Sequence, residues 1–488
     1  MADVEESTEP RTEPRKRGID PVKDRQLLFV GRYGTREMGE IWGPEKTFEY
    51  SLKAQAYAST LIAELHPDIV HPEHANEILW TVVNKKVDPD RIRELEEKTG
   101  HDVIAINTAL EERVSKEAAA HINKARTSAD TTETAKAMQM GESIKVIVES
   151  VENLRDVMLE RAMHDWGKVP HMDCTHWYDA LPTVAGRPFA FFAEMLQSDI
   201  EHLANACRKS LCGKWADATG NHHSAKALGI DGIELQAEYC ERMGLNSMVA
   251  PAQIPGREFI FDIVAAMTRT AGTIANLADY IRWGRSDDVA IFRFPLGKKG
   301  SSAMPHKDAK GGNPTSEEQA DSYFRYMQGC LTTAAATIPF AYARDLSASA
   351  SDRICLEGMF KFGDHTIRNM ASVMQKLVLD EERSRERLAR TYGVTTAQQV
   401  MTYLTDGRLV KEPMSRSEAH DLTGKLATEA FKGKRQFFDV CKENPRIVSV
   451  LGEDLLAKIT DPSTYTGESE RILAEVYDLY HGQKTKFE

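Results

Sequence analysis

The spacing of apolar residues predicts long helices. Three segments, 139–169, 189–250 and 256–294, contain no proline and place apolar residues three or four positions apart. In the first of them these positions are Ile144, Ile147, Val151, Leu154 and Met158. Such spacing gives an α-helix one apolar face, which needs an apolar partner along its length. The pattern therefore predicts a bundle of long amphipathic helices.

The fold class expected from this pattern is mainly α. Alternating β-branched residues are scarce, so no large sheet is indicated. Helices well above the usual length of about 11–12 residues favour an extended bundle over stacked small domains. We expect a disordered tail over 1–27, an N-terminal helical domain over 28–125, a central long-helix bundle over 126–385 and a C-terminal helical domain over 386–488. Long bundles bury further apolar surface against other subunits, so oligomerisation is expected.

Charge and composition narrow the class of partner. The 488 residues include 62 Lys and Arg against 74 Asp and Glu, a net charge of −12. An acidic chain has no general attraction for nucleic acid or for an anionic membrane, so neither is expected as a partner. The uncharged run over 326–343 contains threonines, a glutamine and a proline, which favours a buried helix over a membrane span.

The cysteines indicate the cellular compartment, and the histidines bear on metal binding. The seven cysteines form no CxxC pair, and the N-terminus has no apolar stretch typical of a signal peptide. We therefore expect a cytoplasmic protein. The adjacent His222 and His223 have no acidic or cysteine partner at ligand spacing, so we interpret them as a solvated pair and expect no metal.

The segment over 297–307 is the most informative for chemistry. It reads GKKGSSAMPHK, with glycines and hydroxyls beside three lysines. This composition suits a flexible loop that contacts an anion, although an ordinary solvated loop has a similar composition. The string itself closely resembles the signature of the fumarase/aspartase superfamily, whose members cleave C–N or C–O bonds and release fumarate or a similar product.

Further segments match the same superfamily in order along the chain. They are Gly100–Asp102, Thr127–Asp130, Thr175–Thr183 and Gln253 with Arg257. Three more resemble the adenylosuccinate lyase branch, namely Arg32-Tyr33, the stretch over 344–353 and the ending over 461–467. The resemblance covers residues 32 to about 475.

The resemblance implies a fold, an assembly and a reaction. It implies a three-domain, mainly α fold whose central bundle forms a 20-helix core in a homotetramer, with sites shared between subunits. The implied enzyme is a C–N lyase that eliminates fumarate from the nucleotide adenylosuccinate to give AMP. The same enzyme would cleave the succinylated aminoimidazole carboxamide ribotide, SAICAR, to AICAR. No cofactor is implied.

The resemblance also implies roles for individual residues. Ser301 would be the base, His176 the general acid, Lys307 the partner of a succinyl carboxylate, and His101 an orienting or oxygen-binding residue. Serine is a poor base in water, so its alkoxide would need stabilisation by lysines and backbone N–H groups. The implied substrate-binding residues are Arg32, Tyr33, Asp102, Thr127, Ser128, Gln253, Ser302, Asn313, Arg344, Ser349 and Arg353.

Within that set the residue types differ in purpose. Arg32, Tyr33, Ser349 and Arg353 would hold the phosphate, because a guanidinium meets phosphate oxygens two at a time. Thr127, Ser128 and Gln253 would donate to carboxylate oxygens without adding charge. For His101 a purely structural place at a helix start, beside a capping Asp102, stays open.

The sequence departs from the family pattern at several positions. Residues 308–312 are inserted between Lys307 and Asn313, which leaves the place of Asn313 open. Asn123 stands where many relatives have histidine, Gly100 replaces a basic residue, and 177–179 reads WYD where relatives have a smaller stretch.

Two other functions therefore remain open. One is another lyase or cycloisomerase of the superfamily with a non-nucleotide substrate, against which Arg32-Tyr33 and Arg353 argue. The other is a catalytically silent helical oligomer, against which the presence of both Ser301 and His176 argues.

Overall fold

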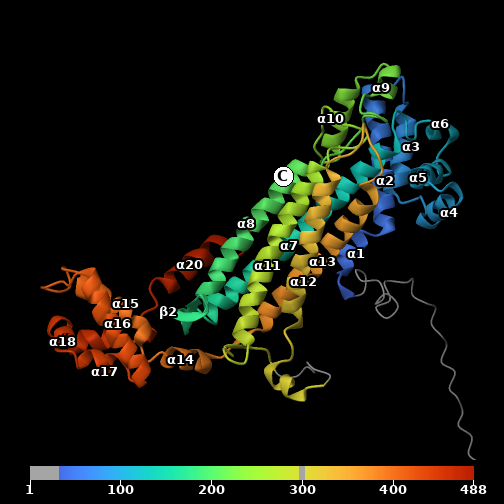
Figure 1. Cartoon of the computed structure of the whole chain (residues 1–488). Helices are drawn as coiled ribbons and strands as arrows, with labels where there is room; N and C mark the ends of the chain where they lie inside the picture. The colour runs from blue at the N-terminus through green and yellow to red at the C-terminus, as the bar shows by residue number, and fades with distance from the viewer. Residues whose placement is uncertain (1–31, 296–302, 488) are drawn as a thin grey trace, which may run out of the picture. The chain divides into compact units, whose positions relative to one another are not determined.

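The computed structural model describes residues 32–295 and 303–487, and its regular structure is mainly helical (Figure 1). This confirms the fold class expected from the apolar spacing. The described residues form two compact units that interleave along the chain. The first unit comprises 32–143, 212–256 and 339–365, and the second comprises 144–211, 257–338 and 366–487. The division of the sequence into domains at residues 125 and 385 stays a prediction.

The first unit consists of short and medium helices around α2. Its helices are α1 Arg36–Ile41, α2 Pro44–Leu65, α3 Pro72–Val83, α4 Pro89–Thr99, α5 Asp102–Glu111, α6 Lys116–Ala119, α9 His223–Ala227 and α10 Gly232–Arg242. The helices α2, α3 and α4 each begin with proline, which suits the first turn because the missing N–H has no helical partner there. Helix α2 packs against α3, α5 and α10 over a core that includes Leu61, Ile78 and Tyr239.

Two long helices contain residues of both units. They are α7 Ser128–His164, 37 residues long, and α13 Ser349–Lys376, 28 residues long. The apolar positions used to predict α7 are buried, among them Ile144, Leu154 and Met158.

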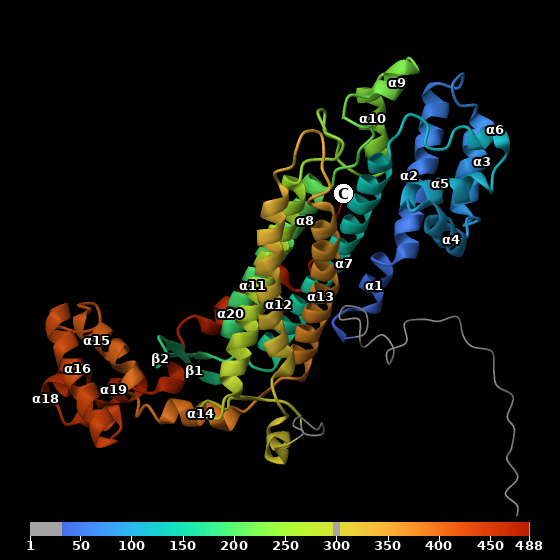
Figure 2. The same ribbon diagram turned by 45° about the vertical axis from the view of Figure 1, so that its right-hand side comes forward.

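The second unit contains three further long helices. They are α8 Arg187–Ser210, α11 Glu258–Arg285 and α12 Thr315–Thr337. Helix α11 packs against both α8 and α12, and the three run side by side in Figures 1 and 2. The last helix, α20 Ser469–Tyr480, packs on α8. No described helix is both long enough and apolar enough to cross a membrane.

The C-terminal part of the second unit has a small core of its own. Its helices are α14 Glu381–Ala389, α15 Ala397–Thr405, α16 Arg416–Gly433, α17 Phe437–Lys442, α18 Pro445–Leu451 and α19 Glu453–Ile459. This part also contains the 3₁₀ helices η4 Val394–Thr396 and η5 Pro462–Thr464, whereas the longer η3 Pro305–Lys310 precedes α12. Leu404, Phe437 and Ile447 are buried at the centre of this cluster.

Within the described ranges the strands form only two small sheets. Strands β1 Pro170–Thr175 and β2 Tyr178–Val184 form an antiparallel hairpin, and β3 Phe292–Arg293 pairs with β4 Val378–Leu379. The helix expected over 189–250 ends earlier, at Ser210. Beyond it Cys212 forms an isolated bridge with Asn246, and a β-carbon on Gly213 would lie 3.0 Å from the Cys240 sulfur.

Candidate active site

His176 lies at the tip of the β1–β2 hairpin. Thr175 pairs with Tyr178, so His176 and Trp177 form a two-residue turn. Their φ angles are 53° and 67°, in the left-handed region that glycine and asparagine usually occupy in such turns. For other side chains this conformation costs on the order of 1–2 kcal/mol per residue. Strain of this kind persists where surrounding contacts fix it and is common at functional sites.

A carboxylate behind the turn provides that fixation. Asp179, near the start of β2, accepts hydrogen bonds from Arg387 on α14 and from Arg390, whose Nη2 lies 2.8 Å from Oδ2. Burial alone would raise the pKa of Asp179, but the hydrogen bonds from the two arginines outweigh it and lower that pKa. The Arg387 side chain is only 3% exposed. Asp179 therefore ties the hairpin to α14 through a largely buried ion pair.

The same hairpin carries a buried histidine that faces α14. His171 on β1 is buried, and its Nδ1 lies 3.2 Å from the Ser384 hydroxyl. Burial, together with the charge of Arg387, lowers the pKa of His171 to about 4. The His171 imidazole between the hairpin and α14 is therefore neutral at neutral pH.

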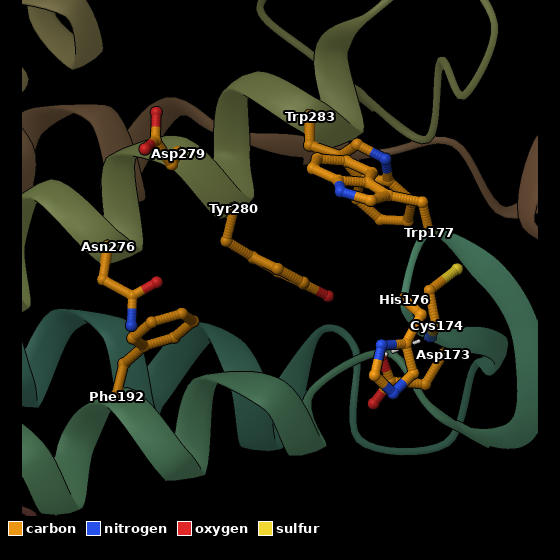
Figure 3. A pocket seen from close by; sticks show the side chains of 9 residues that line it. All are labelled: Asp173, Cys174, His176, Trp177, Phe192, Asn276, Asp279, Tyr280 and Trp283. Atoms are coloured by element: carbon orange, nitrogen blue, oxygen red, sulfur yellow. Dashed lines mark hydrogen bonds between the residues drawn. The ribbon is translucent and has the colours of Figure 1, made fainter.

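His176 borders a cavity of about 370 Å³ in the second unit. The cavity is lined by Asp173, Cys174, His176, Trp177, Phe192, Asn276, Asp279, Tyr280 and Trp283 (Figure 3). Most of its wall is aromatic, and its charged groups are the two carboxylates. We call it the His176 cavity.

Lys307 borders a second cavity of about 250 Å³ in the same unit. It is lined by Arg282, Arg285, Ser286, Asp287, His306, Lys307, Gly312, Asn313 and Pro314. Four of these side chains are basic or can become so, against one carboxylate, which suits an acidic ligand group. We call it the Lys307 cavity. An ion pair of 2.8 Å between Asp279 and Arg282 links one residue of each cavity.

The insertion over 308–312 brings Asn313 back to Lys307. Residues Pro305–Lys310 coil into η3, and Gly311 and Gly312 both have a φ of 82°. The Gly312 N–H then donates to the Lys307 carbonyl at 3.0 Å. As a result the Lys307 ammonium donates to Asn313 Oδ1 at 3.3 Å. The place of Asn313, which the sequence left open, is thus beside Lys307.

Arg285 at the end of α11 anchors this loop. It donates to the Gly312 carbonyl at 3.0 Å and pairs with Glu317 at 2.5 Å. Its guanidinium lies over the Phe294 ring at 4.3 Å. A β-carbon on Gly311 would lie 2.6 Å from that of Phe294, so this position requires glycine for space as well as for its backbone angle. The sequence analysis did not single out Arg285.

In the first unit the structure brings Gln253 and Arg344 together. The Arg344 guanidinium donates to Gln253 Oε1 at 3.1 Å, and the Gln253 N–H donates to the Ala343 carbonyl at 3.2 Å. Asp345 instead binds its own loop, since it accepts from the N–H groups of Ser347 at 2.9 Å and Ala341 at 3.1 Å. The hydrogen bond from the Ser347 hydroxyl lowers the pKa of Asp345, and the two N–H donors lower it further.

The segment that follows this loop begins α13. Ser349 is the first residue of the helix, and Arg353 lies one turn later with an exposed side chain. Exposure leaves the Arg353 guanidinium available to a ligand from solvent.

Thr127 and Ser128 lie at the start of α7, over a buried ion pair. The Thr127 N–H donates to Asp130 Oδ2 at 2.8 Å. Asp130 and Lys214 are both 0% exposed and form an ion pair. Burial lowers the pKa of Lys214, and the charge of Asp130 opposes that shift. Lys214 was missed from the sequence, because nothing local marks a lysine 84 positions away as the partner of Asp130.

The remaining first-unit candidates lie at helix starts or near the beginning of the described chain. His101 is the N-cap of α5 and accepts from the Ile104 N–H at 3.5 Å, and Asp102 is the first residue of that helix. Tyr33 packs its ring against Phe362 at 5.4 Å between ring centroids. Arg32 is exposed. Two further candidates, Ser301 and Ser302, lie outside the described residues.

The described residues can also be searched for groups that could bind a metal ion. No set of three His, Cys, Asp or Glu side chains that could hold a metal ion lies within 32–295 and 303–487. His222 is not solvated as expected. It is buried at the start of α9, and Gly232 lies so close that a β-carbon there would be 2.3 Å from the His222 side chain.

Comparisons with known proteins show which family the chain resembles. Residues 35–328 match a family model described as lyase, and residues 393–476 match one described as adenylosuccinate lyase C-terminus. The chain is 28% identical to an adenylosuccinate lyase from Methanocaldococcus jannaschii, over 93% of this chain and 96% of that protein. It is also 28% identical to one from Pyrococcus horikoshii, over 92% and 96% of the two chains.

Solved structures share the fold. A fumarate lyase from Mesorhizobium sp. BNC1 matches with a TM-score of 0.78 and 19% identity, over 92% of this chain and 99% of that one. A β-carboxy-cis,cis-muconate cycloisomerase from Acinetobacter calcoaceticus sp. ADP1 matches with a TM-score of 0.78 and 17% identity, over 93% and 100%.

Proposed function

The chain belongs to the lyase family whose model it matches over residues 35–328, and we propose that it eliminates fumarate from adenylosuccinate to give AMP. We extend the proposal to SAICAR, which would give AICAR. The match of residues 393–476 to the adenylosuccinate lyase C-terminus supports this substrate class, as do the archaeal relatives.

Elimination of fumarate requires a base, a site for negative charge and an acid. We assign the base to Ser301, which would remove a proton from the carbon beside a succinyl carboxylate. Lys307, held by Asn313 within a basic cavity, would stabilise the negative charge that develops there. His176, on its fixed turn, would protonate the departing nitrogen.

The first unit would supply the rest of the substrate contacts. Arg32, Tyr33, Ser349 and Arg353 would hold the phosphate. Separately, donors to the carboxylates would come from Thr127, Ser128, Gln253, Arg344 and Ser302, with His101 and Asp102 orienting them.

We also propose a cytoplasmic homotetramer with a 20-helix core and sites shared between subunits, acting without a cofactor. The long amphipathic helices α8, α11 and α12 support this assembly, because helices of this kind bury apolar faces against partners. Light scattering of the purified protein would measure the assembly directly.

The observation that carries the proposed function is the Lys307–Asn313 pair in a basic cavity, directly after the signature segment. The test is to incubate the purified protein with adenylosuccinate and to measure fumarate and AMP, which should appear in equal amounts. A carboxymuconate substrate serves as the second arm. Turnover of that compound without release of fumarate from adenylosuccinate would replace our proposal with a cycloisomerase, the main alternative.

A further inference from the structure

The Tyr280 hydroxyl has no internal partner. It lies on α11, its oxygen is buried, and no described residue accepts from it or donates to it. A buried hydroxyl without a partner costs about 1–3 kcal/mol. Figure 3 shows this hydroxyl pointing into the His176 cavity, toward the hairpin turn. The cavity therefore contains a hydrogen-bond donor that a ligand can use.

The Tyr280 group stays neutral over the physiological range. Burial raises the pKa of Tyr280, and the nearby charge of Asp173 raises it further. A neutral phenol both donates and accepts, so it matches a ligand atom such as a ring nitrogen with a lone pair.

Flat aromatic surfaces form the walls around this hydroxyl. The rings of Trp177 and Trp283 lie 6.3 Å apart between centroids, and Phe192 lies 5.6 Å from Tyr280 on the other side. Trp177 is 81% exposed, which is unusual for so large an apolar group. Stacking of a nucleic acid base on an aromatic side chain contributes about 1–3 kcal/mol. The cavity volume of about 370 Å³ falls within the range of small-molecule sites.

The charges in the cavity select against an anionic group. Besides His176, which would carry the proton for the departing nitrogen, the charged groups of the lining are the carboxylates of Asp173 and Asp279, and it contains neither lysine nor arginine. The Lys307 cavity has the opposite character, with Arg282, Arg285 and Lys307 in its wall. Carboxylate and phosphate groups therefore favour the Lys307 cavity or the exposed arginines of the first unit. The His176 cavity suits an uncharged planar ring.

We propose that the His176 cavity is the subsite for the heterocyclic base of the substrate. The ring stacks on Trp177, with the inclined Trp283 indole (58° between the ring planes) at its edge, and the Tyr280 hydroxyl donates a hydrogen bond to a ring nitrogen. Because the aromatic walls are extended, this subsite makes the enzyme prefer a bicyclic purine to a monocyclic imidazole. The inference rests on the proposed function, and it adds the basis of the preference between its two substrates.

The departure from the family pattern at 177–179 builds this subsite. Trp177 supplies one wall. Asp179 holds Arg387, whose guanidinium lies over the Trp283 ring at 5.0 Å. Trp177 and Asp179 therefore supply one indole and fix the cation that packs against the other.

The test compares two variants on both substrates. Tyr280→Phe removes only the hydroxyl, and Trp177→Ser removes a side chain so exposed that its loss leaves the fold intact. We expect each variant to lower kcat/KM for adenylosuccinate about tenfold, the effect of losing one hydrogen bond or one stack. The loss for SAICAR should be at most about threefold. Trp80→Ser, at an exposed tryptophan on α3, is the matched control and should leave both values unchanged. Equal losses on the two substrates, or no loss on either, would overturn the proposal.

A binding measurement separates this proposal from the proposed function. Adenosine contains the base without phosphate or succinyl groups, and its binding beside two indoles should quench tryptophan fluorescence. If the enzyme releases fumarate from adenylosuccinate, the ratio of the losses in kcat/KM on the two substrates tests the subsite. If it releases none, the proposed substrate is wrong and adenosine binding tests the subsite instead. Adenosine affinity that falls at least tenfold in Trp177→Ser, measured by the quenching, would then support the base subsite. Absent or unchanged quenching in that case would remove the subsite as well.

Discussion

The turn that carries His176 and the loop that carries Lys307 belong to the same unit but are built in opposite ways. The turn forces two non-glycine residues into the left-handed region and ties them down through Asp179. The loop uses glycine for its two left-handed residues, Gly311 and Gly312, and is anchored by Arg285. The cavity beside the turn is aromatic with two carboxylates, whereas the cavity beside the loop is basic.

The roles proposed for the His176 turn and the Lys307 loop would account for this difference. A proton donor works only from a fixed geometry, so the cost of a strained turn is offset by a buried ion pair. A carboxylate-binding end works through charge, which falls off gradually with distance and tolerates a more adaptable backbone. The comparison therefore separates a region specified by geometry from one specified by electrostatics.

The largest effect is expected on the loop side. Ser301→Ala removes the assigned base and should lower turnover by several orders of magnitude, at least about 10³-fold. The variant should keep its helical content and its elution volume, which circular dichroism and gel filtration check. Near-normal turnover in a folded variant would remove Ser301 from the mechanism.

The hairpin side should dominate the dependence of stability on acid. His171 has a pKa of about 4 when folded, against about 6.5 for an ordinary histidine. Between these values the unfolded chain binds more protons, so the free energy of unfolding falls as pH drops from about 6.5 to 4. The expected loss is on the order of 3 kcal/mol, measured as a shift of the urea midpoint between pH 7.5 and 4.

His171→Asn, which cannot titrate, isolates that contribution. Its midpoint should depend less on pH than that of the parent protein, although its stability at pH 7.5 is lower. The same pH dependence in both proteins would show that His171 is not the group responsible.

The next largest effect is expected at Asp179, which connects the hairpin to Arg387 and Arg390. Asp179→Asn weakens the hold of Arg387 and Arg390 on the hairpin, and a shift of about 1 Å at His176 is enough to cost on the order of 10² in turnover. We expect kcat to fall while KM changes little, with partial recovery in Asp179→Glu. Asp406→Asn, which weakens the pair between the half-buried Asp406 and the exposed Arg408, is the control. A change confined to KM would contradict a positioning role.

The smallest effect lies outside both regions, at the proposed phosphate site. Arg353→Ala should raise KM for adenylosuccinate about tenfold with kcat little changed, because a phosphate remote from the breaking bond contributes uniform binding. Succinyl-adenosine, which lacks the phosphate, should lose less. If both compounds lose equally, Arg353 does not bind the phosphate.

Local pattern predicted the long helices well. The apolar positions around Ile147 lie on the buried face of α7, and most of the proline-free segment over 256–294 forms α11, which ends at Arg285. The segment over 189–250 was predicted less well. Its helix ends at Ser210, and the chain then bridges Cys212 to Asn246, a long-range contact that apolar spacing does not reveal.

The site was predictable as a set of residues but not as a set of contacts. Motif matching singled out four residues that form two pairs. Lys307 meets Asn313 only because the insertion folds, and Arg344 meets Gln253 across 91 positions of the chain. Asp179 stood out only as a departure from the family pattern. Its partner Arg387 lies 208 positions away, where no local signal marks it.

The central claim is that the His176 turn and the Lys307 loop both act in the elimination. The most direct test measures the rate of fumarate release from adenylosuccinate in His176→Asn and Lys307→Ala, with Lys310→Ala as the matched loop control. The account predicts that the first two variants fold normally and each lose at least about 10² in kcat, since each removes one end of the reaction. Lys310→Ala should lose less than Lys307→Ala, because Lys307 donates to Asn313 in the basic cavity and keeps the family spacing from Ser301. Wild-type turnover in either of the first two variants, or a larger loss in Lys310→Ala than in Lys307→Ala, would contradict it.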